Sequence, residues 1–212
     1  SCSRFGERTV EIVPARCDLA GLQGAANRAF RLNEVPAVEE AAAAEVRDVK
    51  GGGGLNIEAL EMSPDQKRLL IGFRSPLRDG RALIASVVNP KALFESDEAP
   101  RIAPELEELD LGGQGIRGLS YVPALGAYLV IGGPVSRERA SFDLWRWSGE
   151  PGAPAHRVTV PGLGGIEKAE GVSPAVVGGL ERIVIVSDDG DRDAGRFAGY
   201  LLLDPAQLQT AS

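Results

Sequence analysis

The 212-residue chain has few of the residues that most often carry chemistry, with two Cys, one His and one Met. Cys2 and Cys17 are too few for a disulfide framework and lack the spacing of a metal-binding motif. They form either one bridge or two inert thiols. His156 has no G-x-S-x-G sequence near it, and a Ser-His-Asp triad needs a histidine beside such a nucleophile. We therefore do not expect catalysis by His156.

Long apolar runs and basic stripes are also missing. No apolar stretch approaches the ~18 residues of a membrane-spanning helix, which excludes such a span. The formal net charge of −7 repels phosphate backbones, and this excludes nucleic acid as a partner. Residue 1 is Ser rather than Met. Because removal of a signal peptide would account for that, we expect a periplasmic or secreted location.

Glycine and proline are abundant instead, with 27 and 14 residues. Glycine is about twice as frequent as in an average protein, and the combination favours a turn-dense all-β fold. Strands are expected at 9–13 and 30–35, where apolar residues alternate with polar ones. One short helix is expected at 37–46, which is rich in Ala and Glu and follows a proline.

From residue 55 onwards, short apolar stretches form three successive units. The predicted strands are 56–62, 68–74, 82–88 and 106–111 in the first unit, 116–122, 128–132, 142–147 and 156–160 in the second, and 168–172, 182–187 and 197–203 in the third. Four short strands that recur every ~40–60 residues are typical of propeller blades. We predict an all-β chain, a β-propeller segment built of four-stranded antiparallel blades, with about three to four blades present.

The predicted organisation is a single domain, 1–212, that forms part of a longer propeller. Its parts are the outer strands of a blade plus a short helix (1–50), two blades (51–111 and 112–160) and a blade that lacks its outer strand (161–212). Propellers typically have four to eight blades, so these units do not close a ring. We expect the remaining blades to come from the same gene product or from another chain.

Two sequence motifs resemble those of a known protein family. The stretch Gly-Leu-Asn56-Ile-Glu58-Ala-Leu60, followed by Gly72-Phe-Arg74-Ser-Pro-Leu77, resembles a bacterial family of β-propeller domains of unknown function. That family shows I-E-G-L followed by G-x-R-S-P-L. The segments 3–8 and 169–172 resemble further motifs of it. Esterase-like phytase domains are similar, and gluconolactonase-like propellers place comparable glutamates on a metal in their central channel.

The chain departs from these patterns at two positions. Ala59 replaces the usual glycine, and Arg117 stands where a third glutamate would suit a metal. The resemblance therefore implies a propeller fold without implying a three-carboxylate site or an established activity.

The candidate site consists of the charged residues that recur on the first strand of each unit. Glu58, Arg117 and Glu170 are spaced by 53 to 59 residues, and Asn56 and Arg74 lie near the first of them. If first strands line a propeller axis, these side chains converge there. Carboxylate and amide oxygens suit a hard cation such as Ca²⁺. The alternative is an ion-paired channel in which Arg117 satisfies both glutamates without a ligand.

A second acidic cluster spans residues 188–193. Alternating Asp and Gly resemble a calcium loop, but position twelve counted from Asp188 is Gly199 and not the Glu of an EF-hand. The alternative is a solvated hairpin turn. Asp188 follows a strand directly and joins Glu58 and Glu170 as a candidate metal ligand. Trp145 and Trp147 lie two apart on one strand, which favours packing between blades over ligand binding.

Two functions fit these features. One is a calcium-dependent, metal-assisted hydrolase of a phosphoester or carboxylic ester, in which the cation polarises the scissile group. The other is a non-enzymatic propeller that binds or scaffolds a protein or a small ligand. Three or more oxygens within coordination reach would favour the hydrolase, and an Arg–carboxylate network would favour the binding protein.

Overall fold

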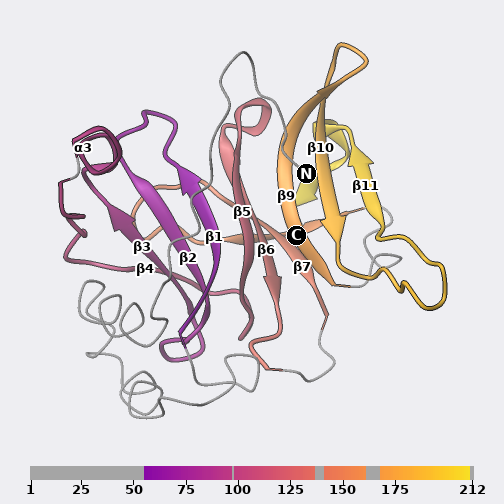
Figure 1. The fold of residues 1–212 in the computed structure, drawn as a ribbon, viewed down its shortest axis with the longest axis horizontal. Coiled ribbons are helices and arrows are strands. Elements are labelled where there is room, and N and C mark those ends of the chain that lie inside the picture. The colour runs from indigo at the N-terminus through magenta and orange to yellow at the C-terminus, as the bar shows by residue number, and fades with distance from the viewer. Residues whose placement is uncertain (1–54, 97, 137–140, 161–167, 211–212) are drawn as a thin grey trace.

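The computed structural model describes residues 55–96, 98–136, 141–160 and 168–210, and within them the chain is built of three antiparallel sheets. The sheets follow one another in chain order and stand side by side, as Figure 1 shows from the indigo first sheet to the yellow end of the third. The expected all-β antiparallel architecture is therefore confirmed. No helix in these residues is long and apolar enough to cross a bilayer.

Strands that are consecutive in the chain make up each sheet, with one addition to the second sheet from the end of the chain. The first contains β1 (Asn56–Met62), β2 (Leu69–Ser75), β3 (Ala82–Val87) and β4 (Glu107–Leu109). The second contains β5 (Gly115–Val122), β6 (Ala127–Gly133), β7 (Asp143–Trp147) and β8 (His156–Thr159). The third contains β9 (Ala169–Val177), β10 (Leu180–Ser187) and β11 (Tyr200–Leu203).

These strands correspond to all eleven predicted from residue 55 onwards. Two of them are three residues shorter than expected, because β4 covers only three residues and β11 begins at Tyr200 rather than at residue 197. The expected strands at 9–13 and 30–35 and the helix at 37–46 lie outside the described residues. One short helix that the sequence did not suggest, α3 (Pro90–Glu95), begins with a proline in its first turn.

The turns explain how the strands reverse. Gly178 and Gly179 form a two-residue connection between β9 and β10, with φ values of 60° and 79°. Positive φ at both positions is the geometry of the tight hairpin turn that glycine adopts without strain. A 3₁₀ turn, η3 (Pro123–Leu125), connects β5 and β6 and ends on Gly126, whose φ is 56°.

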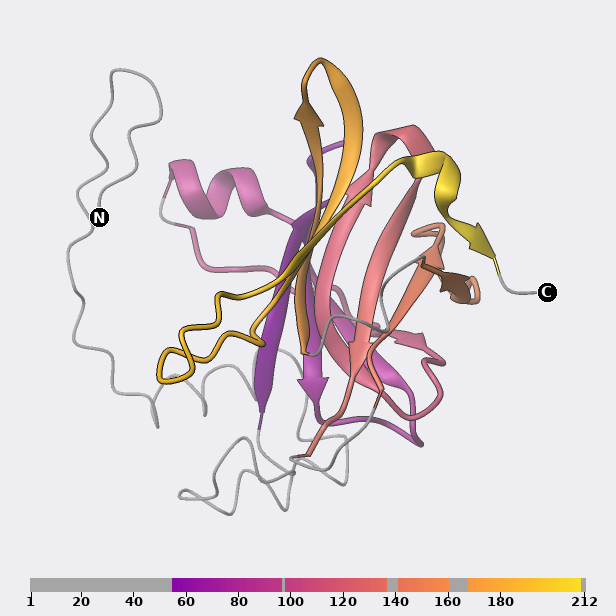
Figure 2. The same cartoon turned by 90° about the vertical axis from the view of Figure 1, so that its right-hand side faces the viewer.

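The end of the chain departs from the expected four-stranded pattern. After β11 it passes through a 3₁₀ turn, η5 (Pro205–Gln207), to the two-residue strand β12 (Gln209–Thr210). This strand pairs with β8, so the second sheet has five strands, while the third has three. Figure 2 shows this yellow segment leaving the third sheet for the edge of the second. The second unit thus has its four expected strands, β5 to β8, and the fifth strand of its sheet comes from the third unit, which was not expected.

The core lies between the sheets. We call the side of a sheet toward its predecessor in the chain its front face, and the opposite side its back face. The back of the first sheet packs on the front of the second through residues such as Ile84, Leu119 and Trp147. The back of the second packs on the front of the third through residues such as Leu144 and Ile185. The middle sheet is therefore covered on both sides.

The front of the first sheet has a different cover. Phe73 and Leu83, on β2 and β3, are fully buried there beneath Leu93 of α3 and Ile102 of the following segment. Burial on both faces explains why β2 is an almost continuous apolar run rather than an alternating one.

Candidate functional site: an Arg–Glu lattice on three first strands

The three charged residues that recur in the sequence occupy the same structural position. In β1 the pairing with β2 skips Glu58, because Ile57 pairs with Phe73 and Ala59 with Gly72. The pairing of β5 skips Arg117, and the pairing of β9 skips Glu170, in the same two-against-one pattern. Each charged residue is thus the extra residue of a β-bulge. A bulge redirects a side chain out of the regular alternation of a strand.

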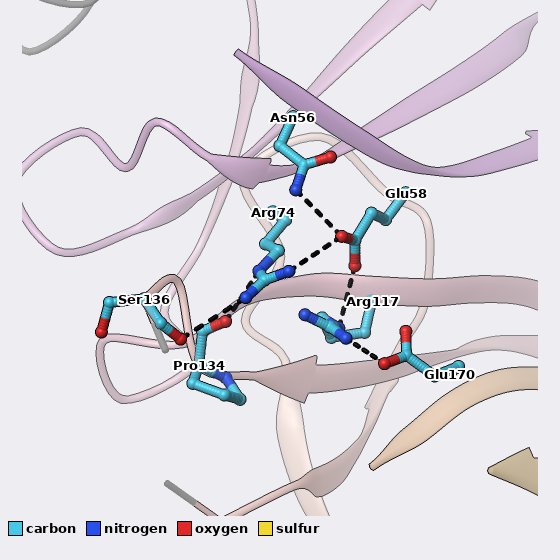
Figure 3. Close-up of polar contacts among 7 residues, drawn as sticks. All are labelled: Asn56, Glu58, Arg74, Arg117, Pro134, Ser136 and Glu170. Atoms are coloured by element: carbon cyan, nitrogen blue, oxygen red, sulfur yellow. Dashed lines mark hydrogen bonds and ion pairs between the residues drawn. The ribbon is translucent and has the colours of Figure 1, made fainter. Parts of the chain in front are cut away.

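The bulges bring the three side chains together (Figure 3). Arg117 lies between the two glutamates, with its Nε 2.8 Å from Glu58 Oε2 and its Nη2 bonded to Glu170 Oε1. The contact with Glu58 is an ion pair without the angle of a hydrogen bond. The strand pairings confirm the expected equivalence of Glu58, Arg117 and Glu170 on the first strands of the three units. The ion pairs confirm the expectation that an arginine pairs with one of the glutamates.

Arg74, at the end of β2, bonds both to the carboxylate of Glu58 and to a loop. Arg74 Nη1 donates to Glu58 Oε1 at 3.1 Å, and Asn56 Nδ2 donates to the same oxygen at 2.9 Å. Arg74 Nε and Nη2 donate to the carbonyls of Pro134 and Ser136. Both oxygens of Glu58 therefore face positive or donor groups. We call Glu58, Arg74, Arg117 and Glu170 the Arg–Glu lattice.

The lattice is partly shielded from solvent. The side chains of Arg74 and Arg117 are each 8% exposed, and those of Glu58 and Glu170 are 21% and 31% exposed. Phe142 shields Arg117 further, since its ring centre lies 5.6 Å from the guanidinium carbon. Desolvated charges of this kind are stable only when they are paired, and here each arginine has a carboxylate partner.

Close backbone approach sets the positions of these residues. A Cβ on Gly115, at the start of β5, would lie 1.9 Å from the carbonyl oxygen of Arg74. Only glycine allows the two strands to approach so closely. The approach places Arg117 two residues further along β5, next to Glu58. The contact between the first and second sheets therefore explains why a glycine stands two residues before Arg117.

The geometry does not assemble a cation site from the candidate ligands. Arg117 stands between Glu58 and Glu170, where a metal would have to bind. Asp188 is exposed, and its backbone N–H donates to the carbonyl of Lys168. Among the described residues, no group of three or more His, Cys, Asp or Glu side chains is placed to hold a metal ion.

The acidic cluster at 188–193 forms part of the loop between β10 and β11. Asp189 accepts hydrogen bonds from the Ser187 hydroxyl and the Gly199 N–H. These bonds, the hydroxyl first, lower the pKa of Asp189 from its ordinary value of 3.8. Asp191 accepts from the N–H groups of Asp193 and Ala194, as a turn-forming aspartate does. These contacts fit the hairpin-turn interpretation of this cluster.

Trp145, Trp147 and His156, which the sequence also singled out, lie away from the Arg–Glu lattice. Trp147 is buried and Trp145 packs beside it against the first sheet, which fits the packing interpretation. His156 is exposed at the start of β8 and lines a cavity of about 270 Å³ with Arg146 and Ser148. No residue of the Arg–Glu lattice lines that cavity.

Sequence reasoning found the lattice residues but missed two supporting features. The bulges were not recognised, although the spacing of the charges relative to the apolar residues is the same in all three strands. The carbonyls of Pro134 and Ser136 were also missed, because backbone acceptors leave no trace in residue identity. No protein-family model matches the chain, and no curated protein matches it.

Proposed function

We propose that the three sheets are blades of a β-propeller and that the protein is a non-enzymatic binding or scaffold module. One observation carries the proposal: Arg117 fills the space between Glu58 and Glu170, so the charges at the first strands satisfy one another. A site that is already neutral and paired holds neighbouring blades together and needs no ligand.

The propeller arrangement is supported by the repeated geometry. The three sheets follow each other in chain order, their first strands are neighbours, and each first strand carries the same bulge. Three sheets are fewer than the typical four to eight blades. In this proposal, the remaining blades come from the same gene product or from another chain.

The alternative function, a calcium-dependent ester or phosphoester hydrolase, needs oxygen ligands that converge on a cation. Calcium titration monitored by differential scanning fluorimetry separates the two functions. For a binding module we expect no calcium-dependent change in the melting temperature of the wild type or of Glu58→Gln. A calcium-dependent stabilisation of the wild type that Glu58→Gln removes would refute the proposal.

A hydrolase assay supplies a second, independent test. We expect no turnover of p-nitrophenyl phosphate or p-nitrophenyl acetate above the rate without protein, with or without added calcium. Turnover that disappears in Glu58→Gln but persists in Glu181→Gln, an exposed glutamate on β10, would establish the hydrolase instead.

A further inference from the structure

Both ends of the sheet array expose apolar side chains at positions that are buried inside the array. The strand pairings and bulges align the three sheets residue by residue, so equivalent positions can be compared directly. On the front faces, Leu60, Leu119 and Val172 are equivalent because each pairs with the second strand at the same distance from its bulge. Leu119 and Val172 are 6% and 8% exposed, whereas Leu60 is 62% exposed.

On the back faces, the exposed position is in the third sheet rather than in the first. Ile84, Leu144 and Tyr200 are equivalent, since they pair with Gly72, Ile131 and Val186 in turn. Ile84 and Leu144 are 0% and 1% exposed beneath the next sheet, but Tyr200 is 70% exposed. Val186, beside it, is 45% exposed, whereas its equivalent Ile131 is 2% exposed. The back of the third sheet and the front of β1 are therefore the two sides of a sheet-to-sheet contact that the described residues do not form with each other.

We propose that these two open faces bind each other between copies, so that the back of the third sheet of one copy packs on β1 of a second copy. The inference rests on the propeller arrangement proposed above and names the partner as a second copy of this chain. The chain already makes this type of contact twice internally, from the first sheet to the second and from the second to the third. Head-to-tail contacts of this kind form a closed ring when the rotation allows it.

Closure with two copies fits the blade number. The described residues of two copies supply six sheets, within the four to eight of typical propellers.

The contact is small because this chain already covers part of the first sheet. Leu93 and Ile102 lie over β2 and β3, which leaves Ile57 and Leu60 of β1, with Phe94 of α3, as the exposed apolar surface. Because this patch covers only part of one sheet face, we expect it to be smaller than the roughly 800 Å² per partner of a standard interface. We therefore expect weak association.

Sedimentation velocity of the full chain tests the proposal between about 1 and about 200 μM, a range that brackets weak association. The average mass should rise from the monomer value towards twice that value across this range, without exceeding it. Leu60→Lys and Val186→Lys should each stay at the monomer mass, and Tyr200→Lys should repeat the result for the back face. Val176→Lys is the matched control, because Val176 is 74% exposed but its side chain is on the front of β9.

Mixing the two variants distinguishes head-to-tail from face-to-face contact. Leu60→Lys retains an intact back face and Val186→Lys an intact β1, so their equimolar mixture should form a dimer where each alone remains a monomer. Dimers that persist in Leu60→Lys would overturn the proposal in favour of symmetric back-to-back contact. Masses above the dimer would overturn ring closure.

A wild type that stays monomeric at every concentration would overturn the second copy as the partner. A large fall in melting temperature of monomeric Val186→Lys would do so as well, because it would mean that the chain covers this face itself. Neither result affects the calcium and hydrolase tests, which use the monomer, so failure of the dimer is distinguishable from failure of the binding-module proposal.

Discussion

The second and third sheets share the same strand arrangement but differ in how far their faces are buried. Both are antiparallel, both begin with a strand that carries a bulged charged residue, and both place apolar residues on their two faces. Among the described residues, the second sheet is covered on both faces, and the third is covered only on its front. The apolar pattern of a strand therefore predicts that its face can pack against another sheet. Whether the face is buried depends on which sheet lies next to it.

Equivalent residues on the two back faces should differ most in their effect on stability. Leu144→Ala removes a fully buried side chain between two sheets, and we expect a loss of about 2–5 kcal/mol. Tyr200→Ala, at the equivalent exposed position, should change the free energy of unfolding by no more than about 0.5 kcal/mol. Urea denaturation at low protein concentration measures both. Equal losses would show that the third sheet is covered as the second is.

The Arg–Glu lattice joins the first strands of all three sheets, and breaking it should have the next largest effect. Arg117→Met leaves Glu170 without its partner and should cost about 3 kcal/mol, the lower end for buried pairs because the glutamates are partly exposed. The double variant Arg117→Met, Glu170→Gln removes both charges of this pair, leaves the Arg74–Glu58 pair in place, and should be less destabilised than the single variant. Additive losses in denaturation experiments would mean that Arg117 and Glu170 do not act as a unit.

Tyr128, on the covered front of the second sheet, should make stability fall at high pH. Burial, the main cause, raises its pKa from 10.0 to about 12. The neutral phenol is therefore favoured in the folded state. Its contribution is complete below pH 10 and is lost as the pH rises from 10 to about 12, at a rate of at most about 1.4 kcal/mol per pH unit. Denaturation of Tyr128→Phe across this range should show a shallower pH dependence than the wild type.

The smallest effect is expected for an exposed ion pair on the second sheet. Arg157 bonds to Asp143, but its side chain is 58% exposed. Arg157→Met should therefore cost less than about 1 kcal/mol, against about 3 for Arg117→Met. Repeating both measurements at high salt sharpens the comparison, because the exposed pair is screened and the lattice much less so. A loss from Arg157→Met as large as that from Arg117→Met would contradict the distinction.

The sequence by itself located eleven of the twelve strands in the described residues and grouped these eleven into three units. Alternating or continuous apolar stretches between Gly- and Pro-rich turns predicted them, because strand formation and reversal depend on nearby residues. It also identified Glu58, Arg117 and Glu170 as equivalent, since each is a charged residue at the same place in a repeated pattern of apolar residues. The propeller and the function remain proposals.

The tertiary structure decided which of these residues meet and which faces stay open. The pairing of β12 with β8, the contact of Arg74 with the carbonyls of Pro134 and Ser136, and the position of Arg117 between two carboxylates all join residues far apart in the chain. Such contacts depend on how twisted sheets stack, and this is set by the packing of whole faces rather than by local sequence. For the same reason, Leu144 is buried and its equivalent Tyr200 is not, although both lie on apolar strands.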